Sequence, residues 1–121
     1  LGATPSLLLA LNNDKKLVVY KNGQWISAAK NNPFPSEVVL RASINIGDDS
    51  TLLATQQHGL YILHADSISH FRTKDIDAIA VNNVYGASLL DTDRIALYTN
   101  LSGCIIINIY SIGLTVCGNA W

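Results

Sequence analysis

The chain has 121 residues, of which 49% are hydrophobic and 14% charged, and its net charge is -1. This balance excludes a disordered chain and supplies enough apolar side chains for one packed domain, or for part of a larger one. Basic residues stand singly apart from Lys15-Lys16, so the sequence also excludes the charged surface that nucleic-acid binding requires.

The ends of the sequence and its apolar stretches give two further expectations. The chain begins at Leu1 and contains no methionine, so we expect a processed product or a piece of a longer protein. Residues 1–20 lack the basic and apolar regions of an intact secretion signal. The longest apolar stretch, Cys104 to Cys117, is shorter than the roughly 20 residues of a membrane helix and contains Asn108 and Ser111. We therefore expect no membrane span.

The first predicted unit, about residues 1–37, consists of short β-type runs separated by polar turns. A run ending at Leu11 is followed by the turn Asn12–Lys15 and by Leu17–Tyr20. Asn22-Gly23 is the clearest hairpin turn in the chain, because both residues adopt positive φ easily. The proline-containing stretch Asn31–Pro35 separates this unit from the next.

The second predicted unit, about residues 38–82, contains four strands rich in β-branched and aromatic residues. The expected strands are Val38–Ile46, Thr51–Gln56, Gly59–His64 and Ser67–Phe71. They alternate weakly, which is typical of strands that are covered on both faces. Between this unit and the next, the spacing of Ile76, Ile79 and Ala80 predicts one short helical turn.

The third predicted unit, about residues 83–121, repeats the second. Residues 52–63 align with residues 96–107 at an offset of 44, and the offset brings Thr55 onto Thr99 and Gly59 onto Gly103. An acidic turn precedes each copy. A fainter copy that begins near Leu8 is placed another 44 residues upstream.

A period of about 44 residues with four strands per unit is typical of the blades of a β-propeller. The chain holds about 2.75 such units, fewer than the four to eight blades of a closed ring. We therefore predict an all-β fold, an incomplete β-propeller segment of about 2.75 four-stranded antiparallel blades.

The repeat resembles that of two-component-regulator propellers, which occur in the extracytoplasmic sensor region of bacterial hybrid sensor kinases and triple-tyrosine regulators. The resemblance rests on Leu52–Thr55 with Gly59-Leu60-Tyr61, on Asp93–Thr99 with Gly103–Ile107, and on Asn82–Tyr85. Ala54 and Tyr98 depart from the usual glycine of the repeat. The resemblance implies a periplasmic location, signal transduction in a two-component system, and a ligand that is often a glycan fragment.

Metal chemistry finds no support in the sequence. His58, His64 and His70 are six residues apart and match no common metal-binding spacing, so we expect turn and edge histidines. The acidic pairs Asp48-Asp49 and Asp91/Asp93 lack the other ligands of a calcium loop and fit hairpin turns. No metal or cofactor is predicted.

Catalytic chemistry also lacks its usual signatures, so we predict a non-catalytic protein. Glu37 is the only glutamate, which excludes a Glu–Glu glycosidase pair. Cys104 lies within an apolar strand and is expected to be a buried structural thiol. The sequence leaves open whether Cys104 and Cys117 pair with each other.

Candidate ligand contacts lie in the turns, because propeller ligands usually bind loops at one end of the ring. The loops around Asn31–Ser36 and Lys74–Asn83 are candidates on this ground. Five single residues are also selected: Trp25, Gln56, Gln57, His58 and Asn100. Tyr61 and Tyr98 are instead expected in the core between sheets.

Three hypotheses follow for the function. The first is a ligand-sensing segment, with an oligosaccharide as the expected ligand. The second is a fragment of a propeller lyase or hydrolase, which a histidine meeting a carboxylate would favour. The third is a structural scaffold for protein contacts. In each case the expected partners include the missing blades of the parent chain, and exposed sheet edges favour self-association.

Overall fold

The computed structural model describes residues 8–47, 49–71, 83–91, 93–100 and 103–108, and the backbone of 114–118. These residues form three antiparallel sheets, and no helix occurs among them, so the prediction of an all-β chain is confirmed. The first sheet contains β1 (Leu9–Leu11), β2 (Leu17–Lys21) and β3 (Gln24–Ser27). The second contains β4 (Leu40–Gly47), β5 (Ser50–Thr55), β6 (Leu60–His64) and β7 (Ser67–Phe71). The third contains β8 (Val84–Leu89), β9 (Arg94–Thr99), β10 (Gly103–Asn108) and β11 (Leu114–Gly118).

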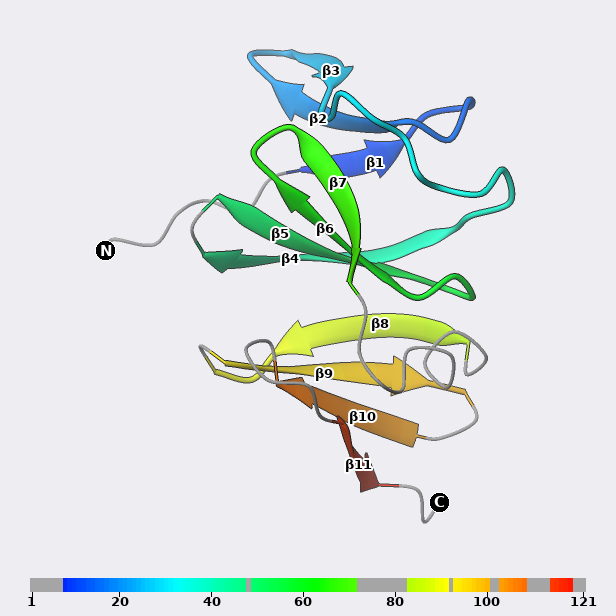
Figure 1. Cartoon of the computed structure of the whole chain (residues 1–121), viewed down its shortest axis with the longest axis vertical. Helices are drawn as coiled ribbons and strands as arrows, with labels where there is room; N and C mark the ends of the chain where they lie inside the picture. Colours follow the sequence, from blue (N-terminus) through cyan, green and yellow to red (C-terminus); the bar gives the residue numbers. More distant parts are fainter. Residues whose placement is uncertain are drawn as a thin grey trace.

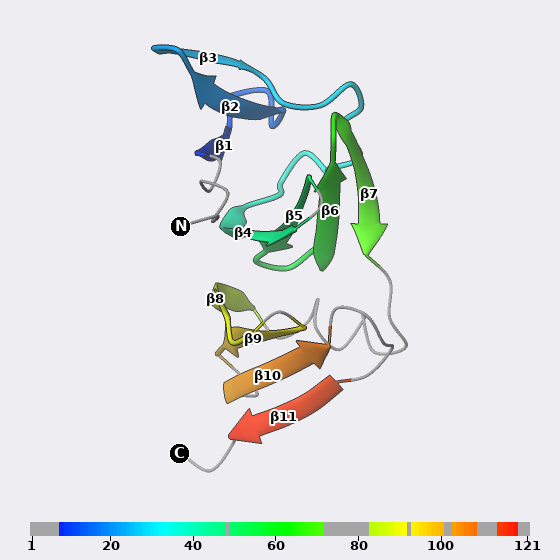
Figure 2. The same ribbon diagram turned by 90° about the vertical axis from the view of Figure 1, so that its left-hand side faces the viewer.

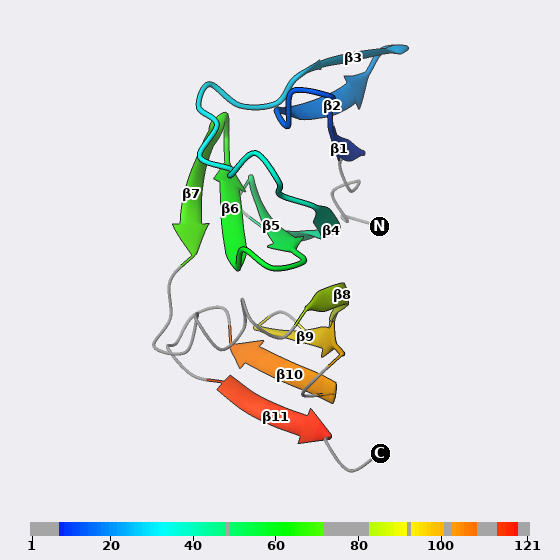
Figure 3. The same ribbon diagram turned by 90° about the vertical axis from the view of Figure 1, so that its right-hand side faces the viewer.

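The three sheets are stacked along the long axis of the molecule, in chain order (Figure 1). Within each sheet the strand order also follows the chain, so every sheet is a simple meander. β1, β4 and β8 lie along the same side of the stack (Figures 2 and 3). Each sheet therefore presents its earliest described strand to that side.

Apolar side chains fill the two spaces between the sheets. Leu53 and Tyr61 belong to a cluster shared by the first and second sheets, together with Leu17. Leu52 belongs to a second cluster shared by the second and third sheets, together with Leu97. Because Leu52 and Leu53 point to opposite faces of β5, the middle sheet is buried on both sides, which explains its weak hydrophobic alternation.

The 44-residue repeat is reproduced in the hydrogen bonds of the second and third sheets. Thr55 Oγ1 donates to the Gly59 carbonyl at 2.7 Å, and Thr99 Oγ1 donates to the Gly103 carbonyl at 2.9 Å. Both threonines are buried, and both glycines have positive φ, of 81° and 68°. Each bond closes a hairpin loop, so the recurring Thr and Gly are the residues that define these turns.

The strand register repeats with the same offset, including an irregularity. A bulge separates the pairs Leu40↔Thr55 and Ala42↔Ala54 in the second sheet. Its counterpart in the third sheet separates Val84↔Thr99 and Gly86↔Tyr98. A bulge is a specific backbone feature, so its repetition shows that the two sheets have the same backbone pairing at this point.

The fainter copy is offset from the second sheet by 43 residues, and the prediction of 44 is wrong. The pair Leu9↔Val19 in the first sheet corresponds to Leu52↔Ile62 in the second. The pair Tyr20↔Trp25 corresponds in the same way to Leu63↔Ile68. A shift of one residue exchanges the two faces of a strand, so only the offset of 43 assigns each side chain to its correct face.

Most predicted strand limits agree with the structure to within two residues. The largest difference is at Val38, which lies in a turn closed by its N–H to the Pro35 carbonyl (3.2 Å), so β4 begins at Leu40. The hairpin at Asn22-Gly23 is confirmed: φ is 50° and 83° at these residues, and Lys21 pairs with Gln24. The helical turn predicted near Ile76, like Asp48, lies outside the described residues.

Cys104 is disulfide-bonded, so the prediction of a buried structural thiol is wrong. Its side chain is half-buried. The register of β10 and β11 shifts between Cys104, opposite Gly118, and Ile105, opposite Val116. The backbone of the other cysteine, Cys117, therefore lies in a bulge beside Cys104.

Candidate functional site

The β5–β6 loop meets the entry segments of β4 and β8 on one side of the stack, on the right in Figure 1. The Gln56 N–H donates to the Val39 carbonyl at 2.9 Å, and the Gln56 carbonyl accepts from the Val84 N–H at 3.0 Å. The second bond links the second sheet to the third. At the equivalent place 44 residues later, the Asn100 N–H donates to the Asn83 carbonyl at 3.3 Å.

Side-chain amides gather at this junction, and we call Gln56, Gln57, Asn83 and Asn100 the amide cluster. Gln57 Nε2 donates to Asn83 Oδ1 at 2.7 Å, between two different sheets. Arg41 Nη2 donates to Gln56 Oε1 at 2.8 Å. Gln57 and Asn100 are exposed. The cluster thus offers neutral donors and acceptors to solvent on a backbone that is fixed by the strands.

His58 borders the amide cluster and meets a carboxylate. Its Nε2 lies 3.3 Å from Glu37 Oε1, and its side chain is 24% exposed. Its backbone N–H donates to Thr55 Oγ1 at 3.0 Å, which fixes the residue in the loop. Its Nδ1 is buried and has no hydrogen-bond partner among the described residues. A water or ligand atom at Nδ1 would satisfy this nitrogen.

The Ser36 hydroxyl is the main cause of a lowered pKa at Glu37. It donates to Glu37 Oε2 at 2.9 Å, and the backbone of Glu37 and the neighbouring His58 add to the effect. The carboxylate form is therefore favoured. Glu37 is available as an acceptor and a negative charge beside the loop.

The three histidines lie in separate places. His64 Nδ1 is 2.8 Å from Ser50 Oγ, and the ring of His70 stacks on Tyr61 with centroids 4.7 Å apart. Within the described ranges, no three His, Cys, Asp or Glu side chains are grouped as metal ligands. Among the residues that the structure describes, His58 forms a pair with the Glu37 carboxylate.

Of the five predicted ligand contacts, the structure brings four together and leaves one apart. Gln56, Gln57, His58 and Asn100 all lie at the junction described above. Trp25 lies in β3, beside the β2–β3 turn and toward the opposite end of its sheet. There it is 48% exposed and makes an edge-to-face contact with Tyr20, with centroids 5.3 Å apart.

The acidic turn before β9 has a structural role. Asp91 Oδ1 accepts the N–H groups of Asp93 and Arg94 at 3.0 and 2.9 Å, and Oδ2 accepts the Arg94 side chain at 2.7 Å. This pattern is a side-chain-stabilised turn. The Arg94 side chain is the main cause that lowers the pKa of Asp91.

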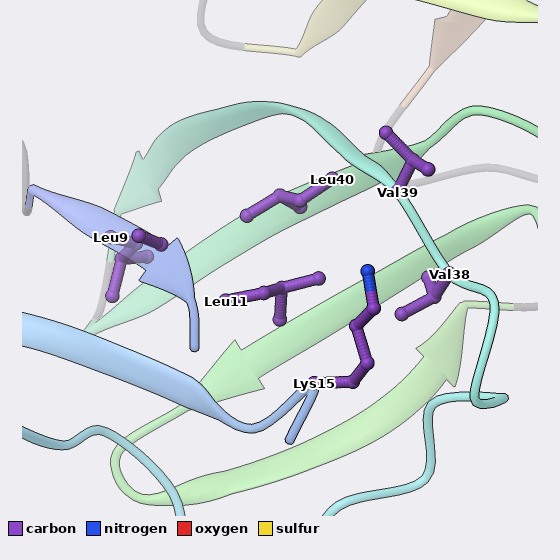
Figure 4. Close-up of a pocket in the computed structure, with 7 residues that line it drawn as sticks. Leu9, Leu11, Lys15, Val38, Val39 and Leu40 are labelled. Carbon is purple, nitrogen blue, oxygen red and sulfur yellow. The ribbon is translucent and has the colours of Figure 1, made fainter. Parts of the chain in front are cut away.

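A cavity of about 310 Å³ near the first sheet separates β1 from the segment entering β4 and is lined by apolar residues and Lys15 (Figure 4). Another, of about 270 Å³, is polar and lies between the start of β2 and the segment that follows β3. Its lining includes Lys30, Asn31 and Asn32. The polar cavity thus involves the loop around Asn31–Ser36 that the sequence selects.

Arg41 was not selected from the sequence, although it contacts the amide cluster. Its position aligns with Tyr85, 44 residues later, and both are the extra residues of the repeated bulge. Bulges often redirect a side chain near a functional site. The repeat alone does not predict the bulge at Arg41, so the sequence could not identify this residue as part of the site.

The side-chain amides at this junction can both donate and accept hydrogen bonds. The described part of the chain contains no helix with the length and hydropathy of a membrane span. Comparison of the sequence with protein-family models and with curated proteins, and of the structure with solved structures, finds no match.

Proposed function

We propose that the three sheets are consecutive blades of a β-propeller that recognises a ligand without turnover. Two features support blades: each sheet is an antiparallel meander, and the second and third share register, bulge and turn bonds. Propeller blades are antiparallel sheets arranged around one central axis, and the equivalent strands β4 and β8 lie on the same side of the stack (Figures 2 and 3).

The observation that carries the recognition function is the amide cluster. It contains Gln57, whose bond to Asn83 spans two sheets, so the binding groups are placed by the packing of one sheet on another. Sugar hydroxyls both donate and accept hydrogen bonds, and amides match them in both roles. We therefore propose an oligosaccharide as the ligand class.

The disulfide of Cys104 supports the proposed compartment. Disulfides persist in oxidising environments such as the bacterial periplasm. Together with the repeat's resemblance to two-component-regulator propellers, this bond supports an extracytoplasmic sensor of a bacterial signalling receptor.

Calorimetry tests the proposal with the longest natural polypeptide that contains this chain. A panel of soluble oligosaccharides should cover neutral, acidic and amino sugars. We expect saturable binding of at least one sugar without its hydrolysis, and a loss of about tenfold in affinity for Gln57→Ala. Gln24→Ala, an exposed amide in β3, is the matched control and should bind as the unaltered protein does. The proposal is wrong if no sugar binds the folded protein, or if both variants bind equally.

A lyase or hydrolase fragment is the second candidate, and the His58–Glu37 pair favours it. A histidine held by a carboxylate is a general-base arrangement. In this alternative, an oligosaccharide of the same panel would be cleaved, and Glu37→Gln would reduce the rate with little change in binding.

A further inference from the structure

The repeated bulge places two different side chains beside the amide cluster. Arg41 is the extra residue of β4, and Tyr85 is the extra residue of β8, 44 positions later. Both are exposed, Tyr85 to 57%. β4 and β8 pack on each other along the same side of the stack (Figures 2 and 3). Because packed sheets lie about 10 Å apart, the two bulges are about one sheet spacing apart.

The bulge position stays exposed even where another sheet packs on its strand. β8 packs on β4, and Ala42 and Ile44 of β4 are partly buried in the cluster between the second and third sheets. Arg41, which directly precedes Ala42, is nevertheless exposed. A bulge redirects its extra side chain, so the exposure of Arg41 and Tyr85 follows from the bulge itself.

Arg41 carries a positive charge that no carboxylate of the described residues neutralises. Its Nη2 donates to Gln56 Oε1, and this neutral amide is its partner within the described ranges. The Glu37 carboxylate, four residues earlier, is engaged by His58 at Oε1 and by Ser36 at Oε2. The other N–H donors of the Arg41 guanidinium therefore remain for a ligand, and their planar fork matches an acidic group.

Tyr85 presents an aromatic ring that rests on a fixed neighbour. Its ring centroid lies 6.3 Å from that of Tyr98, at an interplanar angle of 33°. The Tyr98 hydroxyl donates to Ser88 Oγ at 2.8 Å, and a Cβ at Gly86 would lie 3.3 Å from Tyr98 Cδ2, so the glycine leaves room for this ring. The C–H groups on one face of a sugar ring are apolar and pack well on an exposed aromatic ring.

The amide cluster connects these two side chains. Arg41 belongs to the second sheet and Tyr85 to the third, and the bond from Gln57 to Asn83 joins the two sheets. The backbone of Asn83 has a φ of 51°, a conformation that asparagine tolerates better than most residues. A guanidinium, side-chain amides and an aromatic ring thus follow one another along the stack.

We infer that this site selects acidic oligosaccharides, an inference that rests on the proposed recognition of an oligosaccharide by the amide cluster. Arg41 binds a carboxylate or sulfate group of one sugar, the amides bind hydroxyl groups, and the ring of a further sugar stacks on Tyr85. Arg41 then determines the charge of the ligand, whereas Tyr85 adds affinity without regard to charge.

Paired oligosaccharides test the inference with the longest natural polypeptide that contains this chain. Calorimetry compares tetrasaccharides of polygalacturonate and hyaluronan with their carboxyl-reduced forms, and a tetrasaccharide of chondroitin sulfate with its desulfated form. We expect at least one acidic form to bind about tenfold more tightly than its counterpart, and less tightly as ionic strength rises. The pair that differs distinguishes a carboxylate from a sulfate.

Variants of Arg41 identify the source of this preference. Arg41→Gln should weaken binding of the acidic form about tenfold and leave its counterpart within about twofold, and the dependence on ionic strength should disappear. Lys21→Gln, which removes an exposed charge from β2, is the matched control and should keep the preference. An equal loss for both forms would mean that Arg41 acts only by positioning Gln56, which would overturn its assigned role.

Variants of Tyr85 test the stacking contact. Tyr85→Ala should weaken both forms by the same factor, about five- to tenfold, whereas Tyr85→Phe keeps the ring and should bind as the unaltered protein does. Tyr20→Ala, which removes a 45% exposed ring from β2, is the control and should have no effect. Unchanged binding by Tyr85→Ala, or a loss confined to the acidic form, would contradict stacking.

These outcomes separate the inference from the proposed function. If the neutral counterparts bind as tightly as the acidic forms, selection of acidic sugars is wrong, and recognition of oligosaccharides stands. If no sugar of either kind binds the folded protein, both are wrong. Gln57→Ala should weaken both forms, because the amides bind hydroxyl groups that both forms share.

Discussion

The hydroxyl of Thr55 gives a sharp test of how the repeat stabilises the fold. Thr55 is fully buried; its Oγ1 donates to the Gly59 carbonyl at 2.7 Å and accepts from the His58 N–H at 3.0 Å. Thr55→Val replaces the hydroxyl by a methyl group of similar size. Each hydrogen bond contributes about 1 kcal/mol, so we expect a loss of about 2 kcal/mol of unfolding free energy.

The assay is urea unfolding, with thermal unfolding as a second measure. For a chain of this length a loss of about 2 kcal/mol lowers the Tm by roughly 8 °C. Thr51→Val is the matched control, because Thr51 is also buried in β5 but its hydroxyl bonds to none of the described residues. If both variants lower the midpoint equally, the hydroxyl bonds of Thr55 do not explain the recurring threonine.

Three further predictions concern a turn, a charge and the disulfide. Gly23→Ala should lower the free energy of unfolding in urea by about 1 kcal/mol, because φ is 83° at this position. No atom lies within 4 Å of the new Cβ, so a steric clash adds nothing to this loss, and an unchanged free energy would show that the turn relaxes. The pKa of Asp91 is lowered in the folded state, so its stabilisation is present above the unfolded value near 3.8 and is lost as pH falls through the lower folded value. Asp91→Asn should therefore lower the Tm at pH 7 and not at pH 2, and a deficit that persists at pH 2 would contradict this role. Reducing the disulfide should destabilise the chain by about 2 to 4 kcal/mol, and Cys104→Ser should make the Tm insensitive to reductant.

The sequence alone predicts the features that depend on neighbouring residues. Asn22-Gly23 identifies its hairpin because two successive positive φ angles are required there. Thr55 and Gly59 recur 44 residues later because each pair closes a loop within its own hairpin. Each of these signals depends only on residues within one hairpin, so it can be recognised without knowing how the sheets pack.

The contacts between sheets could not be predicted in the same way. Gln57 bonds to Asn83, 26 residues away, and His58 meets Glu37 across the entry to β4. No spacing rule joins such residues, because the distance between them depends on how the sheets stack. The sequence could select the β5–β6 turn as a ligand site, but it could not provide the side chains that complete it.

The offset of the first sheet has the largest consequence for the proposed function. The sequence lacks the Thr and Gly markers in this unit, because Asn12 and Lys16 occupy their places, and without them a slip of one residue cannot be detected. The correct offset of 43 aligns Tyr20 with Leu63 and Trp25 with Ile68.

In the second sheet, Leu63 and Ile68 are each 3% exposed and pack toward the first sheet. In the first sheet, Tyr20 and Trp25 occupy the positions of Leu63 and Ile68, so they lie on the equivalent face. There they are 45% and 48% exposed. Large exposed aromatic side chains on one face indicate a contact surface. A further sheet stacked there would bury them as the first sheet buries Leu63 and Ile68, which is what a ring of blades requires. We therefore propose that Trp25 belongs to a sheet-to-sheet interface, and under this proposal Trp25→Ala should leave sugar affinity unchanged.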